Sequence, residues 1–308
     1  MATTEPVLVV AFNRPDLLAR LIQRLREVQP ERVFVAIDGP RPDRPDDAER
    51  IRACRDLAGT IDWPCDVSTL FQDVNLGCGL GVSSAITWFF QHVERGIILE
   101  DDILPDPSFF GFCAELLERY HNNPRVFAIS GCNVVPRSEL ANPANDYRFS
   151  QVPLVWGWAT WRRSWREHRL DDRGWYRRLT PINLWRRSGR SLSGAFFWAT
   201  NFELTARGDV DTWDWQLMCA AMRVRQLTAI SNVNLVENNG FGADATHTHD
   251  ADTHLQPVGF VDLPTAPAPV VVDEGADNWS RRHHFGDKFL TSVDRWRKYV
   301  LGHRSEAR

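Results

Sequence analysis

The alternation of two hydrophobic patterns between residues 7 and 131 is the strongest constraint on the fold. Apolar residues recur at helical spacing between short apolar runs, and the first such stretch begins at Pro15, a favoured first helical residue. The apolar runs have the composition of buried strands and lie at 7–12, 32–38, 66–72, 96–100 and 125–131. Strands that alternate with helices form a largely parallel sheet with helices on both faces, so the sequence predicts an α/β fold.

Polar residues follow three of these strands at the point where each strand ends. Asn13 follows the first strand and Asp38 ends the second. Glu100, Asp101 and Asp102 end the fourth. In open parallel sheets, ligands bind beyond the carboxyl ends of the strands. We therefore predict that these residues contribute to one ligand site.

Three adjacent acids at the end of an apolar strand need a compensating partner, because like charges repel and are costly to remove from water. A divalent cation bound through carboxylate oxygens offsets that repulsion. Mg²⁺ or Mn²⁺ then takes its remaining ligands from water and from substrate phosphates. The alternative is a solvated loop whose acids cap the next helix, a role that Asp106 can fill by itself.

The glycine-rich stretch NLGCGLGV, residues 75–82, raises a rival class, a dinucleotide-binding oxidoreductase. It follows a strand, opens a helix and precedes an acid, Glu100, by about twenty residues. The G-x-G-x-x-G spacing fails, because Gly77 and Gly79 require a third glycine at the position of Val82. This class also leaves unexplained why three acids stand where one suffices.

Two acids, Asp211 and Asp214, stand three residues apart at the start of a predicted helix over 212–226. Acids favour that position electrostatically, which is a sufficient structural explanation. A carboxylate between Trp213 and Trp215 is also suited to act as general base toward a hydroxyl. The spacing alone leaves both explanations open.

The segment WGWATWRRSWREHR, residues 156–169, combines indoles with arginines. It is suited to gripping phosphate or a glycan, or to nucleic acid, and its plainest explanation is a helix with an exposed charged face. The net charge of −4 and the absence of a recognised motif argue against nucleic acid. Most of the 13 tryptophans in the chain are expected to fill the core.

The rest of the composition bounds the compartment and the C-terminal region. Six cysteines without a C-x-x-C pair, together with no signal peptide and no membrane-spanning apolar run, predict reduced thiols in a cytoplasmic protein. Residues 251–277 are Pro-rich and expected to be irregular. Residues 285–301 can form a basic amphipathic helix, which either packs on the body or touches the inner face of a membrane carrying a lipid-linked acceptor.

Taken together, the motifs resemble one family. The chain resembles the bacterial nucleotide-diphospho-sugar transferases of the GT-A fold, in the glycosyltransferase family 2-like group. The motifs that carry the resemblance stand in order over residues 6–250: FNRP, DGPRP, NLG, SSAI.WFF, GIILEDD, WGWATWRR, DTWD and NLV.N.GFG.DATHT. A more distant likeness is to the N-acetylglucosaminyltransferase I family, Golgi enzymes with an E-D-D strand end and a later W-D-D-W helix.

The resemblance implies a GT-A type, Rossmann-like fold and a division of the chain into a glycosyltransferase domain and a C-terminal extension. Residues 1–250 would form the glycosyltransferase domain, with a nucleotide-sugar-binding half over 1–135 and an acceptor-side half over 136–250. Residues 251–308 would form a C-terminal extension. The family reaction is transfer of a hexose from a nucleotide-diphosphate sugar, expected to be UDP-linked, to a glycan or other hydroxyl acceptor, as in polysaccharide biosynthesis.

The resemblance also assigns roles to matched residues. Asp102 matches the acid that holds Mn²⁺ or Mg²⁺ against the donor diphosphate, and His247 stands where many GT-A enzymes supply a late metal ligand. Asp214 matches the acceptor-activating base of an inverting single displacement. The residues matched to nucleotide-sugar binding are Phe12, Asn13, Arg14, Asp38, Ser83, Ser84, Glu100 and Asp101. The acceptor-side candidates are Trp156, Gly157, Trp158 and Trp213, with Trp161 as a further stacking candidate.

Two departures from the family pattern limit these assignments. Ala243 stands where an acid is expected, so no carboxylate role falls on that position. Gly79, Leu80 and Gly81 replace a more usual basic pair, which leaves the donor-phosphate contacts open. Two further classes share the fold and stay open as alternatives: a non-catalytic glycan-binding module and a nucleotidyltransferase. The sequence does not indicate the sugar, the acceptor or the oligomeric state.

Overall fold

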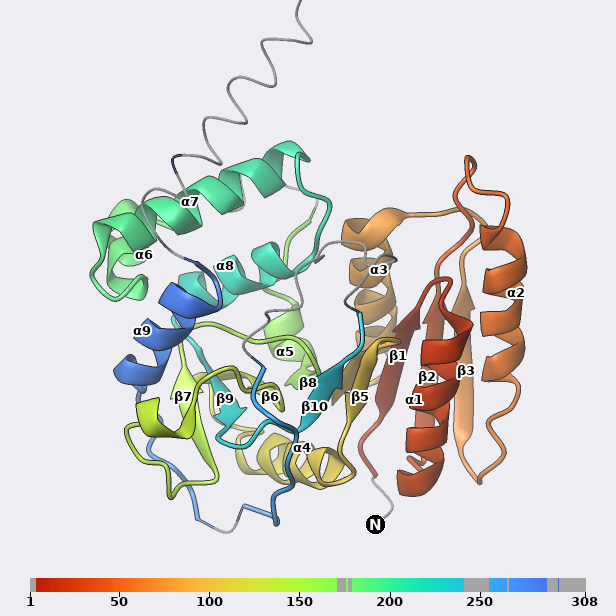
Figure 1. Ribbon diagram of the computed structural model, residues 1–308, viewed down its shortest axis with the longest axis horizontal. Coiled ribbons are helices and arrows are strands. Elements are labelled where there is room, and N and C mark those ends of the chain that lie inside the picture. Colours follow the sequence, from red (N-terminus) through yellow and green to blue (C-terminus); the bar gives the residue numbers. More distant parts are fainter. Residues whose placement is uncertain are drawn as a thin grey trace, which may run out of the picture.

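The computed structural model describes residues 4–170, 176, 179–240, 255–264, 266–286 and 293. Its centre is an eight-stranded sheet that runs across Figure 1 in the order β3-β2-β1-β4-β8-β6-β9-β7. The strands are β1 Val7–Ala11, β2 Arg32–Ile37, β3 Asp66–Phe71, β4 Arg95–Glu100, β6 Val126–Ser130, β7 Tyr147–Ser150, β8 Trp158–Trp161 and β9 Leu227–Ser231. The predicted α/β class, with a mostly parallel central sheet flanked by helices, is confirmed.

The four strands β3, β2, β1 and β4 form the parallel half of the sheet. β1 lies between β2 and β4, so that Val9 pairs with Val35 on one side and with Leu99 on the other. All five apolar runs predicted as strands are strands here, the last of them β6. Of these strands, β1, β2, β4 and β6 are short and almost wholly buried, as expected for strands with both faces covered, whereas the edge strand β3 is largely exposed.

The other half of the sheet departs from the parallel pattern at β8. This strand is antiparallel to β4 on one side and to β6 on the other, and β7 is antiparallel to β9. The Trp/Arg segment therefore does not begin as an exposed helix: its first tryptophans enter the middle of the sheet, and only α5, Arg162–Trp165, is helical. Trp158 and Trp161 are fully buried there.

Helices cover both faces of the sheet and pack on alternate strand residues. One face packs against α1 (Pro15–Val28), α2 (Asp47–Ala58) and α4 (Ser108–Arg119) through strand residues such as Val9 and Leu99. The other face packs against α3 (Gly77–His92), α5 and α8 (Asp214–Val224) through residues such as Leu8 and Ile98. The predicted helix over 212–226 is thus confirmed as α8.

A third hydrophobic cluster lies in the C-terminal half of the chain. The helices α6 (Pro181–Arg187) and α7 (Leu192–Arg207) pack with α8 around Trp198 and Phe202, and they lie above α8 in Figure 1. Two short strands, β5 (Ile103–Pro105) and β10 (Val236–Asn238), pair antiparallel beside the main sheet. β5 follows directly on the acid triplet, so the chain turns sharply at Asp101 and Asp102.

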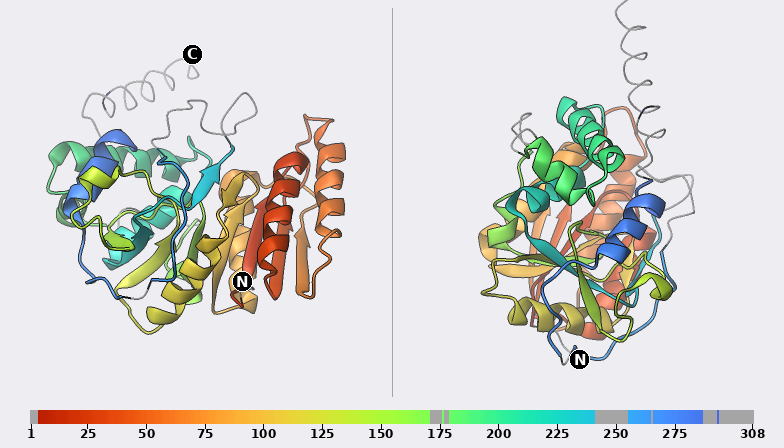
Figure 2. Two further views of the ribbon diagram at one scale, coloured as in Figure 1. Left: turned by 60° about the horizontal axis from the view of Figure 1, so that its bottom comes forward. Right: turned by 90° about the vertical axis from the view of Figure 1, so that its left-hand side faces the viewer.

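The described part of the C-terminal extension packs on the body. A bridge joins Phe149 of β7 to Val272, and α9 (Glu274–His283) then lies beside β7, as both views of Figure 2 show. Residues 255–264 are largely irregular, as predicted for the Pro-rich stretch. Most of the predicted helix over 285–301 lies outside the described residues, as do His247 and Ala243.

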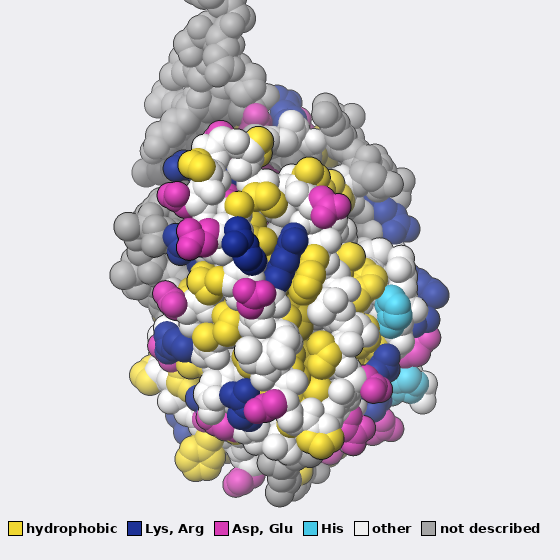
Figure 3. All heavy atoms as spheres, turned by 90° about the vertical axis from the view of Figure 1, so that its right-hand side faces the viewer, with side chains coloured by type: hydrophobic (Ala, Val, Ile, Leu, Met, Phe, Trp, Pro, Cys, Tyr) yellow, Lys and Arg dark blue, Asp and Glu magenta, His cyan; other side chains and the backbone are white. Residues whose placement is uncertain are grey.

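The sheet ends at β3, on the face of the molecule that Figure 3 presents. Val67 and Phe71 are exposed on this edge strand, and the guanidinium of Arg55 lies over the Phe71 ring, 5.3 Å from its centroid. Charge and a covering side chain at an edge oppose pairing with another strand.

Two further features concern the cysteines and the length of the helices. All six cysteines are free, four of them buried. No helix within the described part of the chain is long and apolar enough to cross a bilayer.

Candidate functional site

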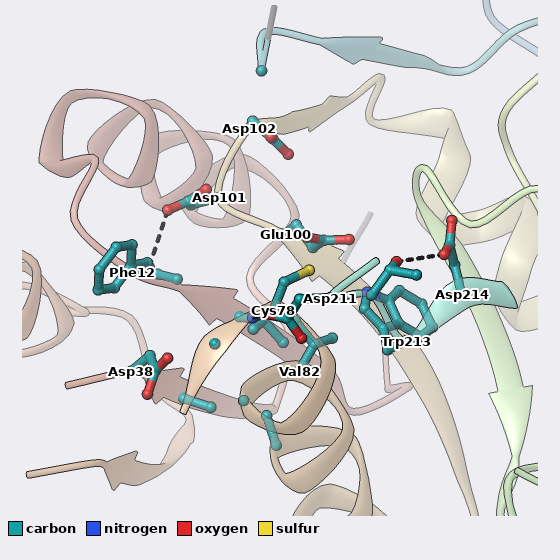
Figure 4. Close-up of a pocket in the computed structure, with 18 of the residues that line it drawn as sticks. Phe12, Asp38, Cys78, Val82, Glu100, Asp101, Asp102, Asp211, Trp213 and Asp214 are labelled. Carbon is teal, nitrogen blue, oxygen red and sulfur yellow. Dashed lines mark hydrogen bonds between the residues drawn. The ribbon is translucent and has the colours of Figure 1, made fainter. Parts of the chain in front are cut away.

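One cavity of about 920 Å³ lies at the carboxyl ends of β1, β2 and β4. The position is the switch point of the sheet, because the chain builds outward from β1 to β2 and β3 and then crosses to β4 on the other side. Ligands bind at such points in open α/β sheets. Figure 4 shows its wall residues converging from β1, β4, α3 and the start of α8.

The acids that end β4 have different surroundings. Asp101 is buried: it accepts the Phe12 backbone N–H through Oδ2 at 3.3 Å and pairs with Arg14 through Oδ1. Asp102 also pairs with Arg14, at 2.9 Å. The Asp101 side chain is 1% exposed and that of Asp102 is 16% exposed, so Asp102 is the one a ligand can reach.

Burial dominates the titration of the first two acids. Together with the neighbouring Asp102 and Asp101 carboxylates, it raises the pKa of Glu100 to about 8. Burial also raises the pKa of Asp101 to about 6, although the Arg14 guanidinium opposes that rise. Crowding of this kind is what a cation would relieve.

Asp38 holds the end of β2 against the loop that precedes α3. Its carboxylate accepts the backbone N–H groups of Gly39 at 2.8 Å and Leu76 at 3.0 Å, and the Asn75 amide at 3.0 Å. Burial raises its pKa, and the backbone donors of Leu76, Gly39 and Gly77 oppose that shift. Asp38 lines the cavity beside Gln72.

Phe12 and Arg41 form the wall between the ends of β1 and β2. The Arg41 guanidinium lies over the Phe12 ring, 5.1 Å from its centroid, and both residues line the cavity. Asn13 does not line it: its amide donates to Asp47 at 2.7 Å, and Asp47 also accepts from Arg41. Asn13 therefore shapes the loop rather than the cavity surface.

The opposite wall is the start of α8. The Asp214 carboxylate accepts the Thr212 hydroxyl at 2.5 Å and the Trp215 backbone N–H at 2.8 Å. The Trp213 ring stacks on Trp158 at 5.6 Å between centroids. Asp211 to Trp215 all line the cavity, so the pair of acids predicted from DVDTWDWQ does face it.

Not every predicted site residue reaches the cavity. Trp156 and Trp213 line it, whereas Trp158 and Trp161 are core residues without an accessible ring face, and a stacking role for them is withdrawn. Gly157, at φ +67, lets the chain pass Val236 closely. On α3, Ser83 and Ser84 are not among the residues that line the cavity, and the Ser84 hydroxyl donates to the Gly81 carbonyl at 2.9 Å.

The donor set suits a hard divalent cation. Six acids line the cavity, Asp38, Glu100, Asp101, Asp102, Asp211 and Asp214, against two arginines, Arg14 and Arg41. Carboxylate oxygens are the ligands that Mg²⁺ and Mn²⁺ prefer. No three His, Cys, Asp or Glu side chains within the described ranges converge as a complete metal site. A cation held here by Asp102 would therefore have at most one further such ligand from this part of the chain.

Several wall residues carry no local sequence signal. Asn201 and Leu204 come from α7, about a hundred residues after the β4 acids. Gly240 approaches Asp102 so closely that an added Cβ would overlap its Oδ2. A pattern search along the chain does not find Asn201 or Leu204, because only the fold brings them to the β4 acids, whereas Cys78 and Gly240 lie in the motifs NLGCGLGV and NLV.N.GFG.

Comparison with known proteins finds solved structures of low similarity. No family model matches the chain. It is similar to the inositol-1-phosphate CTP transferase from T. maritima, with a TM-score of 0.40, 9% identity and coverage of 82% of this chain and 94% of that one. It is also similar to a protein described as a glucose-1-phosphate thymidylyltransferase from Bacillus anthracis, in complex with a sucrose. There the TM-score is 0.32 at 8% identity, with 71% and 95% covered. Likeness at this level assigns neither family nor function.

Proposed function

We propose that the chain is a glycosyltransferase that moves a sugar from a nucleotide-diphosphate donor to a hydroxyl acceptor. One observation carries the proposal: a single cavity holds the strand-end acids of β4 on one wall and Asp214 on the other. Its volume of about 920 Å³ falls within the roughly 300–1,000 Å³ typical of small-ligand sites. The motif resemblance to GT-A transferases supports the same reaction.

The donor would lie along the ends of β1, β2 and β4. Phe12 and Asp38 are placed for the nucleoside, and the UDP form is the one we favour from the resemblance. Arg14 orients Asp102 through its 2.9 Å contact and supplies positive charge beside the diphosphate. A Mg²⁺ or Mn²⁺ ion held by Asp102 would stabilise the negative charge that develops on the leaving diphosphate.

Asp214 would act as the general base. Its two hydrogen bonds, from Thr212 and Trp215, hold the carboxylate at the cavity wall. It takes the proton of the acceptor hydroxyl while that oxygen forms a bond to the anomeric carbon. The bond from that carbon to the diphosphate breaks on the opposite face, so inversion is the expected outcome. Trp156 and Trp213 are the remaining candidates for acceptor contact.

The test is an assay of nucleoside diphosphate release from a panel of nucleotide sugars, with Mn²⁺ and hydroxyl acceptors. Asp214→Asn should lower turnover by about 10²- to 10⁴-fold, because general-base help has that size. Donor binding measured by calorimetry should stay near the wild-type value. Asp209→Asn is the matched control, since Asp209 is exposed in the same loop and does not line the cavity.

Three outcomes would redirect the assignment. Full turnover in Asp214→Asn would remove the base role. Pyrophosphate release from a nucleoside triphosphate and a sugar phosphate, with no transfer to hydroxyls, would make the chain a nucleotidyltransferase. Glycan binding without donor turnover under any condition would leave a binding module of this fold.

A further inference from the structure

The first turn of α3 is capped by a carboxylate that lies far away in sequence. The two oxygens of Asp211 accept the backbone N–H groups of Cys78 and Gly79, each at 2.9 Å. Figure 4 shows Asp211 against Cys78, between the acids of β4 and Asp214. The N-cap residue of α3, Leu76, makes no side-chain cap. Asp211 therefore satisfies donors that the helix leaves open and meets the positive end of its dipole.

The glycines of NLGCGLG make room for this contact. A Cβ added at Gly77 would lie 2.5 Å from Asp211 Oδ2, and one added at Gly79 would lie 2.6 Å from Oδ1. Glycine inside a helix costs about 0.5–1 kcal/mol relative to alanine, so its presence at Gly79 needs a reason. The close approach of Asp211 explains why glycine stands at this position. The dinucleotide-binding pattern does not explain it, because its spacing fails at Val82.

The residues after Asp211 lead directly to the proposed base. Thr212 donates its hydroxyl to Asp214, and the Trp213 carbonyl is 3.1 Å from Nε2 of His168. Asp211, Thr212 and Trp213 thus each contact a different part of the protein. Of these three contacts, that of Asp211 reaches α3, which lies on the side of the cavity that carries the β4 acids.

We propose that Asp211 is a positioning residue, which ties the loop 209–213 to the N-terminus of α3 and thereby sets Asp214 opposite the acids of β4. The link to catalysis rests on the proposed function, which names Asp214 as the base. The tie between Asp211 and α3 does not rest on the proposed function, because it consists of two hydrogen bonds within the chain.

A double-mutant cycle on the full chain tests the tie without any activity. Gly79→Ala should lower the melting temperature by several degrees, since its Cβ would overlap Asp211. In an Asp211→Ala background the same change should cost less than half as much, leaving only the Thr212 carbonyl at 3.2 Å. Gly275→Ala, near the start of α9, is the control, because its Cβ would make only ordinary contacts at 3.5 and 3.6 Å. Additive effects of Gly79→Ala and Asp211→Ala would overturn the tie.

The positioning role needs a kinetic readout that a structural role would not move. In Asp211→Asn, kcat should fall by about 10²-fold, as small misplacement of a reacting group can cost, while the donor KM stays within about twofold. Asp211→Glu, which keeps both acceptor oxygens, should recover part of the lost kcat. If Gly79→Ala and Asp211→Ala are coupled but Asp211→Asn leaves kcat unchanged, the positioning role is refuted and the tie between Asp211 and α3 stands. If the two substitutions are coupled but the wild-type protein turns over no donor, the proposed function is refuted and the tie between Asp211 and α3 stands.

Discussion

At the residue scale, Asp101 and Asp102 lie in the turn between β4 and β5 and differ in burial, although both pair with Arg14. Asp101 turns into the protein, where it holds Arg14 and the Phe12 backbone, and Asp102 turns toward the cavity. The cluster was visible in the sequence, but which acid faces a ligand depends on the turn between β4 and β5.

Replacing Asp102 tests the metal assignment directly. Asp102→Asn should weaken Mn²⁺-dependent binding of a nucleoside diphosphate by at least about tenfold, because a neutral amide is a poorer ligand and leaves the diphosphate charge less compensated. Isothermal calorimetry with and without Mn²⁺ measures the effect. The control is Asp73→Asn, an exposed acid outside the cavity lining. Equal Mn²⁺-dependent affinity in wild type and Asp102→Asn would move the cation elsewhere.

At the element scale, one carboxylate joins α2 to the loops that follow β1 and β2. Asp47 is the first residue of α2 and is buried. It accepts from Asn13 in the loop after β1 at 2.7 Å, and from Arg41 in the loop after β2 at 2.7 and 2.9 Å. Since Arg41 lines the cavity, Asp47 fixes the wall of the site from behind.

The stability of Asp47→Asn should depend on pH in a defined direction. Hydrogen bonds from Arg41 lower the pKa of Asp47 from 3.8 to about 2. A carboxyl whose pKa is lower in the folded state stabilises above its unfolded pKa and loses that contribution as pH falls through its folded pKa. The wild type should therefore exceed Asp47→Asn by about 1.5–3 kcal/mol in unfolding free energy at pH 7, the size of bonds to a charged group.

That difference should shrink as the pH falls from 4 toward 2. Urea titrations at several pH values measure it, and Asp46→Asn, at the neighbouring N-cap position with no side-chain cap bond, serves as control. A difference that stays constant from pH 7 to pH 2 would show that Asp47 acts through shape and not through its charge.

Elements with strong local patterns could be predicted, and those that depend on distant partners could not. Strands such as β1 and β4 and helices such as α1 have continuous apolar runs or a clear helical period. β8 has only four residues, WATW, and is a strand because β4 and β6 flank it. α9 buries Asp277, Ser280 and Arg281 beside Ala276, so no apolar period marks it.

At the scale of the whole molecule, the cavity exists because one sheet joins both halves of the chain. Its wall includes β1 and β4 from the first half, and α7 and the start of α8 from the second. The sequence predicted the first group, since strand ends of a parallel sheet meet at one edge. It could not predict Asn201 or the contact of Asp211 with α3, because these depend on how the helices of the second half pack over the sheet.

The charge of this cavity leads to a prediction for the whole protein. Six lining acids against two arginines repel a diphosphate that binds by itself, and a divalent cation reduces that excess of negative charge. UDP with Mn²⁺ at about 100 times the dissociation constant should stabilise the chain by about 2.7 kcal/mol. For a protein of this size, that corresponds to a rise in melting temperature of about 5 °C.

The shift should be cooperative between the two ligands. UDP in the presence of EDTA, and Mn²⁺ without nucleotide, should each raise the melting temperature by less than half of the joint effect, because each alone leaves the other charge uncompensated. Asp38→Ala should reduce the joint shift whatever sugar the donor carries, since Asp38 shapes the nucleoside end, while Asp214→Asn should keep it. Equal shifts with UDP in EDTA and in Mn²⁺ would mean that Arg14 and Arg41 alone hold the diphosphate, and the cation would then have no place in donor binding.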